Sequence, residues 1–136
     1  MQARRMDMAE RSFLDAIELA PKAMEPHLYY ARQLTDQHRE KDADKEFRAA
    51  IRMETKNPEP RLYYAQFLYR IQNYNQADKQ YRRVLELDPE NAAAHFSYAV
   101  LLGQFEMHER ALEHYKMAAD LNPQYKEFYR SMLRQL

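Results

Sequence analysis

Hydrophobic and small residues recur along this chain at a fixed spacing of 34 residues, which separates Ala43 from Ala77 and Ala77 from Ala111. Further columns keep the same register: Phe47, Tyr81 and Tyr115; Ala50, Val84 and Ala118; Ala31, Ala65 and Ala99; Leu34, Leu68 and Leu102; Tyr30, Tyr64 and Tyr98. A fixed period of this length predicts a stacked-repeat protein, in which each unit buries its apolar face only against its neighbours.

Within one period, the pattern predicts two antiparallel helices joined by a short turn. In the stretch 58–91, Pro58 and Pro60 fit the first turn of a helix, because the missing N–H of proline has no intrahelical partner there. Asn75 is the predicted N-cap of the second helix. That helix should end before Pro89, since proline disfavours helix in the residue that precedes it.

Composition supports thin helical layers and narrows the class of partner. The 136 residues include one Gly, 11 Tyr and 8 Met, so tyrosine, methionine and alanine fill the core in place of branched aliphatics. The net charge is +0, from 21 basic and 21 acidic residues. This balance argues against a nucleic-acid binder, which needs a strongly basic face.

The chain gives no sign of export or membrane insertion. No stretch approaches the roughly 18 apolar residues that a membrane span needs, and the basic N-terminus is not followed by an apolar core. We therefore expect no membrane span and a cytoplasmic location. The absence of cysteine excludes disulfides, thiolate metal sites and cysteine nucleophiles.

Catalytic, metal and cofactor chemistry is not indicated. His108 and His114 are six residues apart and so lie on different helix faces, and Leu112 stands where a zinc-protease helix needs its second histidine. His27 and His95 occupy one repeat column, which makes them packing residues. We expect no metal, no cofactor and no enzymatic activity.

Three stretches match the first helix of a known repeat, Leu28-Tyr29-Tyr30-Ala31, Leu62-Tyr63-Tyr64-Ala65 and Phe96-Ser97-Tyr98-Ala99, and the stretches 43–50, 77–84 and 111–118 match its second helix. The chain thus resembles the tetratricopeptide repeat (TPR) family. The resemblance implies an all-α fold, a right-handed α-solenoid of antiparallel helix pairs. It also implies units at 24–57, 58–91 and 92–125, preceded by the second helix of an incomplete unit at 1–23 and followed by a capping helix at 126–136.

The chain departs from the family pattern at the turn inside each unit. The usual turn glycine is replaced by His38, Gln72 and Glu106. These residues should make the turns conformationally costlier and less stable.

The resemblance further implies a concave surface, lined by the first helices, that holds an extended or helical peptide. The matching positions are Leu28, Tyr29, Arg32, Leu62, Tyr63, Gln66, Tyr69, Arg70, Phe96 and Val100. Tyrosine offers large contact area at low entropic cost and is frequent at binding hot spots. Tyr30, Tyr64 and Tyr98 are expected to pack between helices instead. The implied function is a protein-interaction scaffold or adaptor.

Three other functions fit the sequence less well than a peptide-binding groove. Chaperone-binding members of the family clamp a peptide carboxylate with basic and amide side chains, but of the matching positions only Arg32 carries such a group, so no chaperone carboxylate clamp is expected. Self-assembly is the alternative, because the unpaired N-terminal helix carries Phe13, Leu14 and Ile17 and a second copy could cover them. RNA binding by a related repeat family is disfavoured by the neutral charge.

Overall fold

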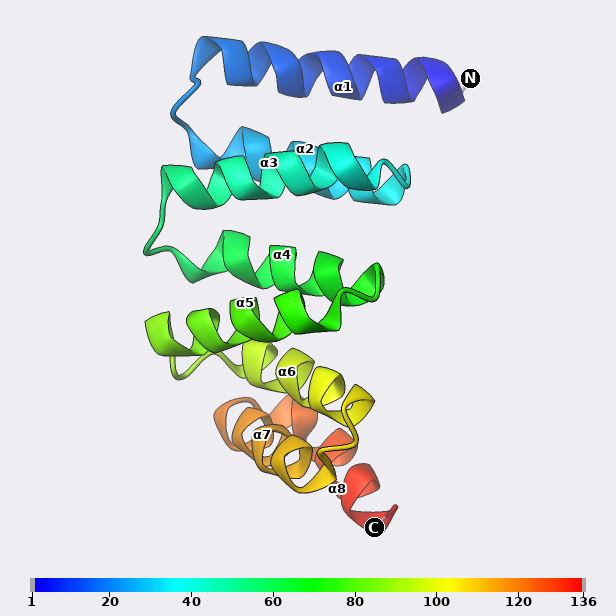
Figure 1. Ribbon diagram of the computed structural model, residues 1–136, viewed down its shortest axis with the longest axis vertical. Helices are drawn as coiled ribbons and strands as arrows, with labels where there is room; N and C mark the ends of the chain where they lie inside the picture. The colour runs from blue at the N-terminus through cyan, green and yellow to red at the C-terminus, as the bar shows by residue number, and fades with distance from the viewer. Residues whose placement is uncertain (1, 136) are drawn as a thin grey trace. The chain divides into compact units, whose positions relative to one another are not determined.

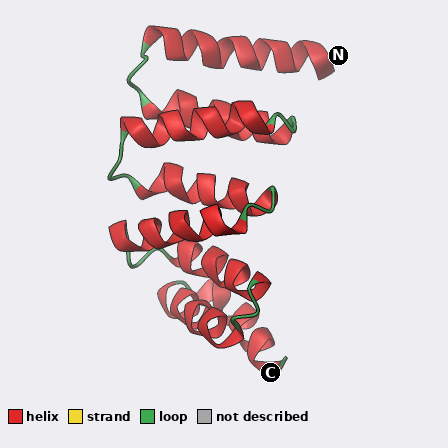
Figure 2. Ribbon diagram, viewed as in Figure 1, coloured by secondary structure: helices red, strands yellow, loops and turns green. Residues whose placement is uncertain are grey.

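A computed structural model describes the backbone of residues 2–135 and the side chains of residues 8–135. Over this range all regular structure is helical, and helices alternate with short loops (Figures 1 and 2). The elements are α1 (Gln2–Leu19), α2 (Met24–Asp36), α3 (Glu40–Met53), α4 (Pro58–Arg70), α5 (Tyr74–Leu87), α6 (Ala92–Gln104), α7 (His108–Leu121), the 3-10 turn η1 (Pro123–Tyr125) and α8 (Lys126–Arg134). The helical class predicted from the spacing is confirmed.

The chain forms two compact units, residues 1–64 and 65–136, and α4 contributes to both. In the first unit, α2 packs against α3 and α1 packs against α2. In the second unit, α6 packs against α7, α5 against α6 and α7 against α8. Each contact joins helices that are neighbours in the sequence, as a stacked repeat requires.

The core of each unit is built from the columns that recur every 34 residues. Ala43, Ala77, Ala65 and Ala99 are 0% exposed. Alanine at these positions lets neighbouring helices approach closely, and a larger side chain there would overpack the helix pair. The tyrosine column 30, 64 and 98 is also buried, which confirms that these rings pack between helices.

The C-terminal end of α5 is where the proline predicts it, but its N-cap is a different residue from the predicted one. This helix ends at Leu87, just before Asp88 and Pro89, as predicted. It begins at Tyr74 with Asn73 in the N-cap position, so the prediction of Asn75 as the cap was wrong. The reason is in the backbone, because the Asn73 carbonyl already accepts the N–H of Ala77 at 3.0 Å and the turn runs directly into the helix.

The turn inside each helix pair is closed by a residue in the left-handed region. The φ angles are 60° at His38, 66° at Gln72 and 59° at Glu106. In each turn the next N–H bonds back to a carbonyl five residues earlier, as from Asn73 to Leu68 at 2.8 Å. This is the hydrogen bond of a Schellman C-cap, where glycine is the usual residue. The three residues thus stand where the family has glycine and adopt the backbone conformation that favours it, while the lower stability expected of these turns stays a prediction.

Glycine at these three positions should stabilise the protein. A side chain in the left-handed region costs roughly 1–2 kcal/mol, which the greater flexibility of unfolded glycine offsets in part. We expect His38→Gly, Gln72→Gly and Glu106→Gly each to raise the free energy of unfolding by about 0.5–1 kcal/mol in urea titrations. Lys79→Gly, at an exposed position inside α5, is the control and should lower it by a similar amount. If the three glycine variants were less stable than wild type, a conformational cost at these turn positions would be contradicted.

Candidate partner-binding surface

In the first unit, the predicted groove positions form a small aromatic and basic surface on α2 and α4. Tyr29 is 48% exposed. Arg32 is exposed, and its guanidinium carbon lies 4.5 Å from the centroid of the Tyr63 ring. Leu62 and Tyr63 are half-buried. A guanidinium held against an aromatic face is partly fixed in orientation before any ligand arrives.

In the second unit, the predicted groove positions are joined by hydrogen bonds between helices. Gln66 Nε2 lies 3.4 Å from the Ser97 hydroxyl oxygen, to which it donates. Gln104 Nε2 donates to the Tyr69 hydroxyl at 3.3 Å. The half-buried Tyr69 is thereby held in place, while Val100 is half-buried and Arg70 is exposed.

Two predicted groove residues take part mainly in packing. Leu28 is only 1% exposed, so it belongs to the core of the first unit and supports the surface that Tyr29 presents. Phe96 is half-buried among the rings of Tyr115, Tyr125 and Phe128, at centroid distances of 5.7, 4.9 and 4.8 Å. Its ring is largely occupied by contacts within the second unit.

A hydrogen bond from tyrosine to carboxylate repeats along the chain and was missed by the sequence reasoning. Its three copies are Tyr30 to Glu10 at 2.6 Å, Tyr64 to Asp44 at 2.6 Å and Tyr98 to Asp78 at 2.8 Å. Arg48 and Arg82 each make an ion pair with the carboxylate of their copy and donate to its tyrosine. The signal was available, because residues 10, 44 and 78 follow the same period as the tyrosines.

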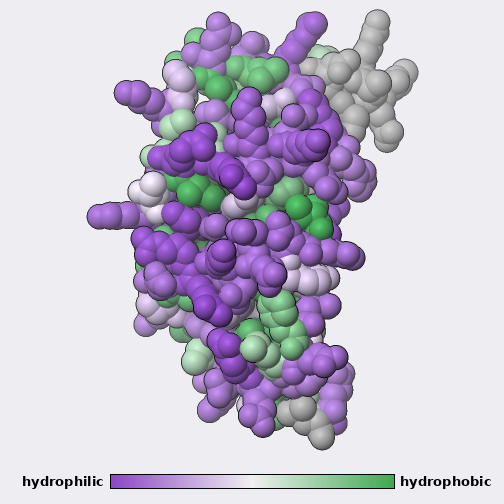
Figure 3. All heavy atoms as spheres, viewed as in Figure 1, coloured by the Kyte–Doolittle hydropathy of each residue, from purple (hydrophilic) through white to green (hydrophobic). Residues whose placement is uncertain are grey.

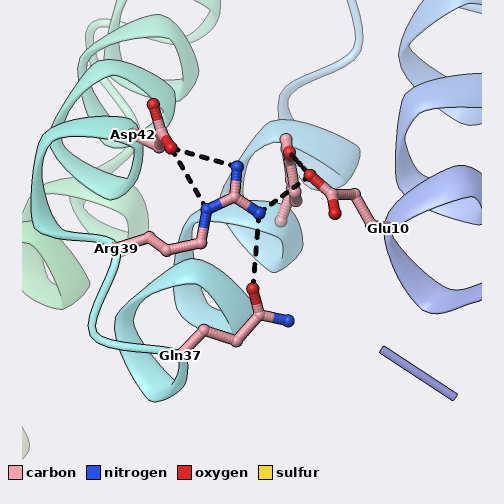
Figure 4. A network of polar contacts seen from close by, with 5 residues as sticks. Glu10, Gln37, Arg39 and Asp42 are labelled. Atoms are coloured by element: carbon pink, nitrogen blue, oxygen red, sulfur yellow. Dashed lines mark hydrogen bonds and ion pairs between the residues drawn. The ribbon is translucent and has the colours of Figure 1, made fainter. Parts of the chain in front are cut away.

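The first copy of this hydrogen bond has a different arginine, since Leu14 stands where Arg48 and Arg82 do. Arg39 takes over, donating to Glu10 at 2.9 Å while its guanidinium also pairs with Asp42 (Figure 4). The hydrogen bonds from Tyr30 and Arg39 lower the pKa of Glu10. Burial, with the bond to Glu10, raises the pKa of Tyr30 to about 12. These hydrogen bonds and ion pairs join α1, α2 and the start of α3.

Two histidines of one repeat column make buried polar contacts. His27 is 8% exposed and donates from Nδ1 to Glu46 at 2.7 Å. His95 is 6% exposed, donates from Nε2 to the Pro89 carbonyl at 2.8 Å, and lies with Nδ1 2.9 Å from Nδ1 of His114. His95 thus accepts from His114, and burial lowers the pKa of His114 to about 4. Their positions fit packing, as predicted, but the His95–His114 contact was missed.

Among the described residues, no group of three or more histidine, aspartate or glutamate side chains is placed to hold a metal ion. In the same part of the chain, none of the helices has the length and apolar character needed to traverse a bilayer.

Comparison with known proteins identifies the repeat. The sequence profile described as "Tetratricopeptide repeat" matches residues 34–95. These residues belong to the tetratricopeptide-repeat family. The resemblance drawn from the alanine, leucine and tyrosine columns is thereby confirmed. A search of curated protein sequences found no match.

Solved structures extend the TPR fold over nearly the whole chain. PilF of Pseudomonas aeruginosa superposes with a TM-score of 0.86 and 22% identity, over 98% of this chain and 63% of that one. A structure of MamA gives 0.77 and 18% identity, over 90% of this chain and 71% of that one. The first TPR of Spaghetti (RPAP3), bound to the HSP90 peptide SRMEEVD, gives 0.74 and 13% identity, over 82% and 91%. The all-α, right-handed α-solenoid of antiparallel helix pairs is confirmed as the fold.

Proposed function

We propose that this TPR chain is a scaffold or adaptor module that binds a segment of a partner protein on the first helices of its repeats. The proposed contacts in the first unit are Tyr29, Arg32, Leu62 and Tyr63, with Leu28 supporting them from the core. Those in the second unit are Gln66, Tyr69, Arg70, Phe96 and Val100. Catalysis, cofactors, metals and nucleic acid have no part in the proposal.

The observation that carries the proposal is the exposed Tyr29 beside an arginine that is already oriented. Tyr29 is 48% exposed, and Arg32 lies over the Tyr63 ring at 4.5 Å. No described carboxylate forms an ion pair with Arg32, so its N–H groups are open to acceptors of a partner. Tyrosine and arginine dominate binding hot spots because they combine large contact area with directed hydrogen bonds. The RPAP3 structure, described as bound to a peptide, shows that a TPR of this fold binds one.

A capture experiment with a matched control tests the proposal. Tagged wild type, the double variant Tyr29→Ala/Arg32→Ala and the control Arg110→Ala are incubated with extract of the source cell, and bound proteins are quantified by mass spectrometry. Arg110 is an exposed arginine on α7, in the second helix of a pair. We expect the double variant to capture at least about tenfold less of a partner protein that wild type and control both capture. Truncation of a hot-spot side chain lowers the binding free energy by about 2 kcal/mol or more. Circular dichroism should show unchanged helicity.

Equal capture by the double variant and wild type would contradict a role for this surface. If the control lost the partner as well, the binding would depend on general charge and not on the surface formed by Tyr29 and Arg32.

Self-assembly through α1 is a second candidate, favoured by exposed apolar side chains on that helix. Met8 is 68% exposed, Leu19 86% and Leu14 46%. Met8 and Leu19 are 11 residues apart, which is about three helical turns, so they share one face. Hydrophobic side chains are visible at the level of α1 in Figure 3, on a surface that is otherwise mostly hydrophilic. Phe13, by contrast, stacks on Tyr30 with ring centroids 5.9 Å apart and is not available to a second copy.

If copies of the chain associate through this face of α1, charged substitutions on it should lower the measured molecular mass. We expect Met8→Glu/Leu19→Glu to convert an oligomer of the wild type to monomer in multi-angle light scattering, because burying two carboxylates in an apolar contact is costly. The control Glu18→Lys alters an exposed position of the same helix and should leave the mass unchanged. A monomeric wild type, or an oligomer that survives the double substitution, would contradict this candidate.

A further inference from the structure

The second unit contains a pocket where α6, α7 and α8 meet. Its volume is about 250 Å³, and it is lined by Gly103, His108, Ala111, Leu112, Tyr115, Met132 and Gln135. The lining is mostly apolar or aromatic. None of these residues belongs to the proposed groove positions.

The internal repeat shows what fills the equivalent space one period earlier, within the same unit. Residues 34 positions before the lining are Tyr69, Tyr74, Ala77, Asp78, Tyr81, Tyr98 and Leu101. The Tyr69 and Tyr74 rings pack with centroids 5.5 Å apart, and the Tyr98 hydroxyl bonds to Asp78. There, side chains of the chain itself occupy the space between three successive helices.

Two of those aromatic rings are missing from the pocket and a third is smaller. Gly103 replaces Tyr69, His108 replaces the Tyr74 phenol with a smaller imidazole, and Met132 replaces Tyr98. A Cβ atom placed on Gly103 would meet no other atom within 4 Å, so open space begins at this residue. The carboxylate column also ends here, since Leu112 stands where Asp78 does. The pocket thus lies at the position where the preceding repeat carries the ring of Tyr69.

We propose that this pocket binds one aromatic ring, the phenol of a tyrosine side chain presented by a partner protein, in the place that Tyr69 occupies one repeat earlier. An apolar cavity of about 150 Å³ holds benzene, so the present pocket has room for a phenol and its methylene group. Its apolar walls supply the hydrophobic contact. Gln135, which stands where Leu101 does one period earlier, adds an amide to the lining, and an amide can donate to a phenol oxygen as Gln104 does to Tyr69. The lining shares no residue with the proposed groove contacts, although Gly103 stands in the repeat column of Tyr69.

A small phenol tests the pocket without any knowledge of the partner. The full chain carries ¹³C-methyl labels on methionine, leucine and alanine, and p-cresol, the free tyrosine side chain, is titrated by NMR. We expect saturable shifts confined to the methyl groups of Ala111, Leu112 and Met132, and weaker effects from isobutanol, which lacks a ring.

Large and small substitutions at Gly103 distinguish an effect of filling the pocket from an effect of changing the glycine itself. Gly103→Tyr restores the side chain of the preceding repeat and should weaken p-cresol binding at least about tenfold, which is 1.4 kcal/mol. Gly103→Leu is a second filling variant in case the tyrosine is not accommodated, while Gly103→Ala leaves the pocket open and should bind as wild type does. Absence of saturable shifts in wild type, or p-cresol binding by both Gly103→Tyr and Gly103→Leu as tight as that of wild type, would overturn the site.

N-acetyl-tyrosinamide distinguishes a partner's side chain from a free phenol. The proposal expects it to shift the same methyl groups as p-cresol, because its backbone would extend out of the pocket mouth. Binding of p-cresol alone would overturn the assignment to a partner protein and indicate a small phenolic ligand. These outcomes do not depend on capture by Tyr29 and Arg32, so either proposal can fail without the other.

Discussion

Replacing Tyr81 with alanine should lower the free energy of unfolding by about 3–5 kcal/mol, the cost of removing a large buried ring. Tyr81 is 2% exposed and its ring centroid lies 5.8 Å from that of Tyr98 on α6. In a repeat protein, stability is close to a sum of units and nearest-neighbour interfaces. A cavity at one interface therefore weakens the coupling on which the whole array depends. Urea unfolding followed by circular dichroism measures the effect.

Tyr81→Phe is the matched control, because it keeps the ring and removes only the hydroxyl. Burial raises the pKa of Tyr81, so the hydroxyl stays protonated throughout the titration. We expect Tyr81→Phe to lower the free energy of unfolding by about 1 kcal/mol, the contribution of one hydrogen bond. An unfolding midpoint of Tyr81→Ala equal to that of wild type would show that this column does not hold the repeats together.

Acidification should destabilise the protein through His114. Burial lowers its folded pKa to about 4 from 6.5, so between these values the unfolded chain binds a proton that the folded chain does not. Stability from this group is therefore present above pH 6.5 and is lost progressively as the pH falls toward 4. Because His114 is only half-buried, we expect a loss of about 1–2 kcal/mol. Its neighbours reinforce the sign, since His95 and Arg110 both oppose a positive charge there.

The variant His114→Gln isolates this contribution from the carboxylates that titrate in the same range. Glutamine occupies the same position one repeat earlier, at Gln80. Between pH 7 and 4, we expect the unfolding free energy of wild type to fall by about 1–2 kcal/mol more than that of His114→Gln. Parallel pH curves would contradict the assigned pKa of His114.

Sequence alone was sufficient for the features that repeat. The alanine and tyrosine columns predicted the helix pairs because a fixed period and helical spacing leave few other ways to bury those residues. The turn residues at 38, 72 and 106 were predicted to be costly from the family resemblance, because the family has glycine there, and all three adopt a positive φ.

What the sequence could not predict depends on which neighbour a side chain meets. The family resemblance implied both Leu28 and Tyr29 for the groove, yet the first is buried and the second exposed. The contact between His95 and His114 joins two helices, and neither residue is notable on its own. The pocket beside Gly103 arises from side chains that are absent, so no residue type marks it. Comparing polar columns between repeats would have found the bond of Tyr64 to Asp44.

The most direct test of the account is photo-crosslinking from the exposed tyrosine of α2. A benzoylphenylalanine placed at Tyr29 is irradiated in the source cell, and the same residue at Lys45, exposed on α3, serves as the control. We expect a discrete crosslinked partner protein from position 29 and none from position 45, with the crosslink weakened when Arg32 is alanine. No crosslink at position 29, or the same products from both positions, would contradict binding on the first-helix surface.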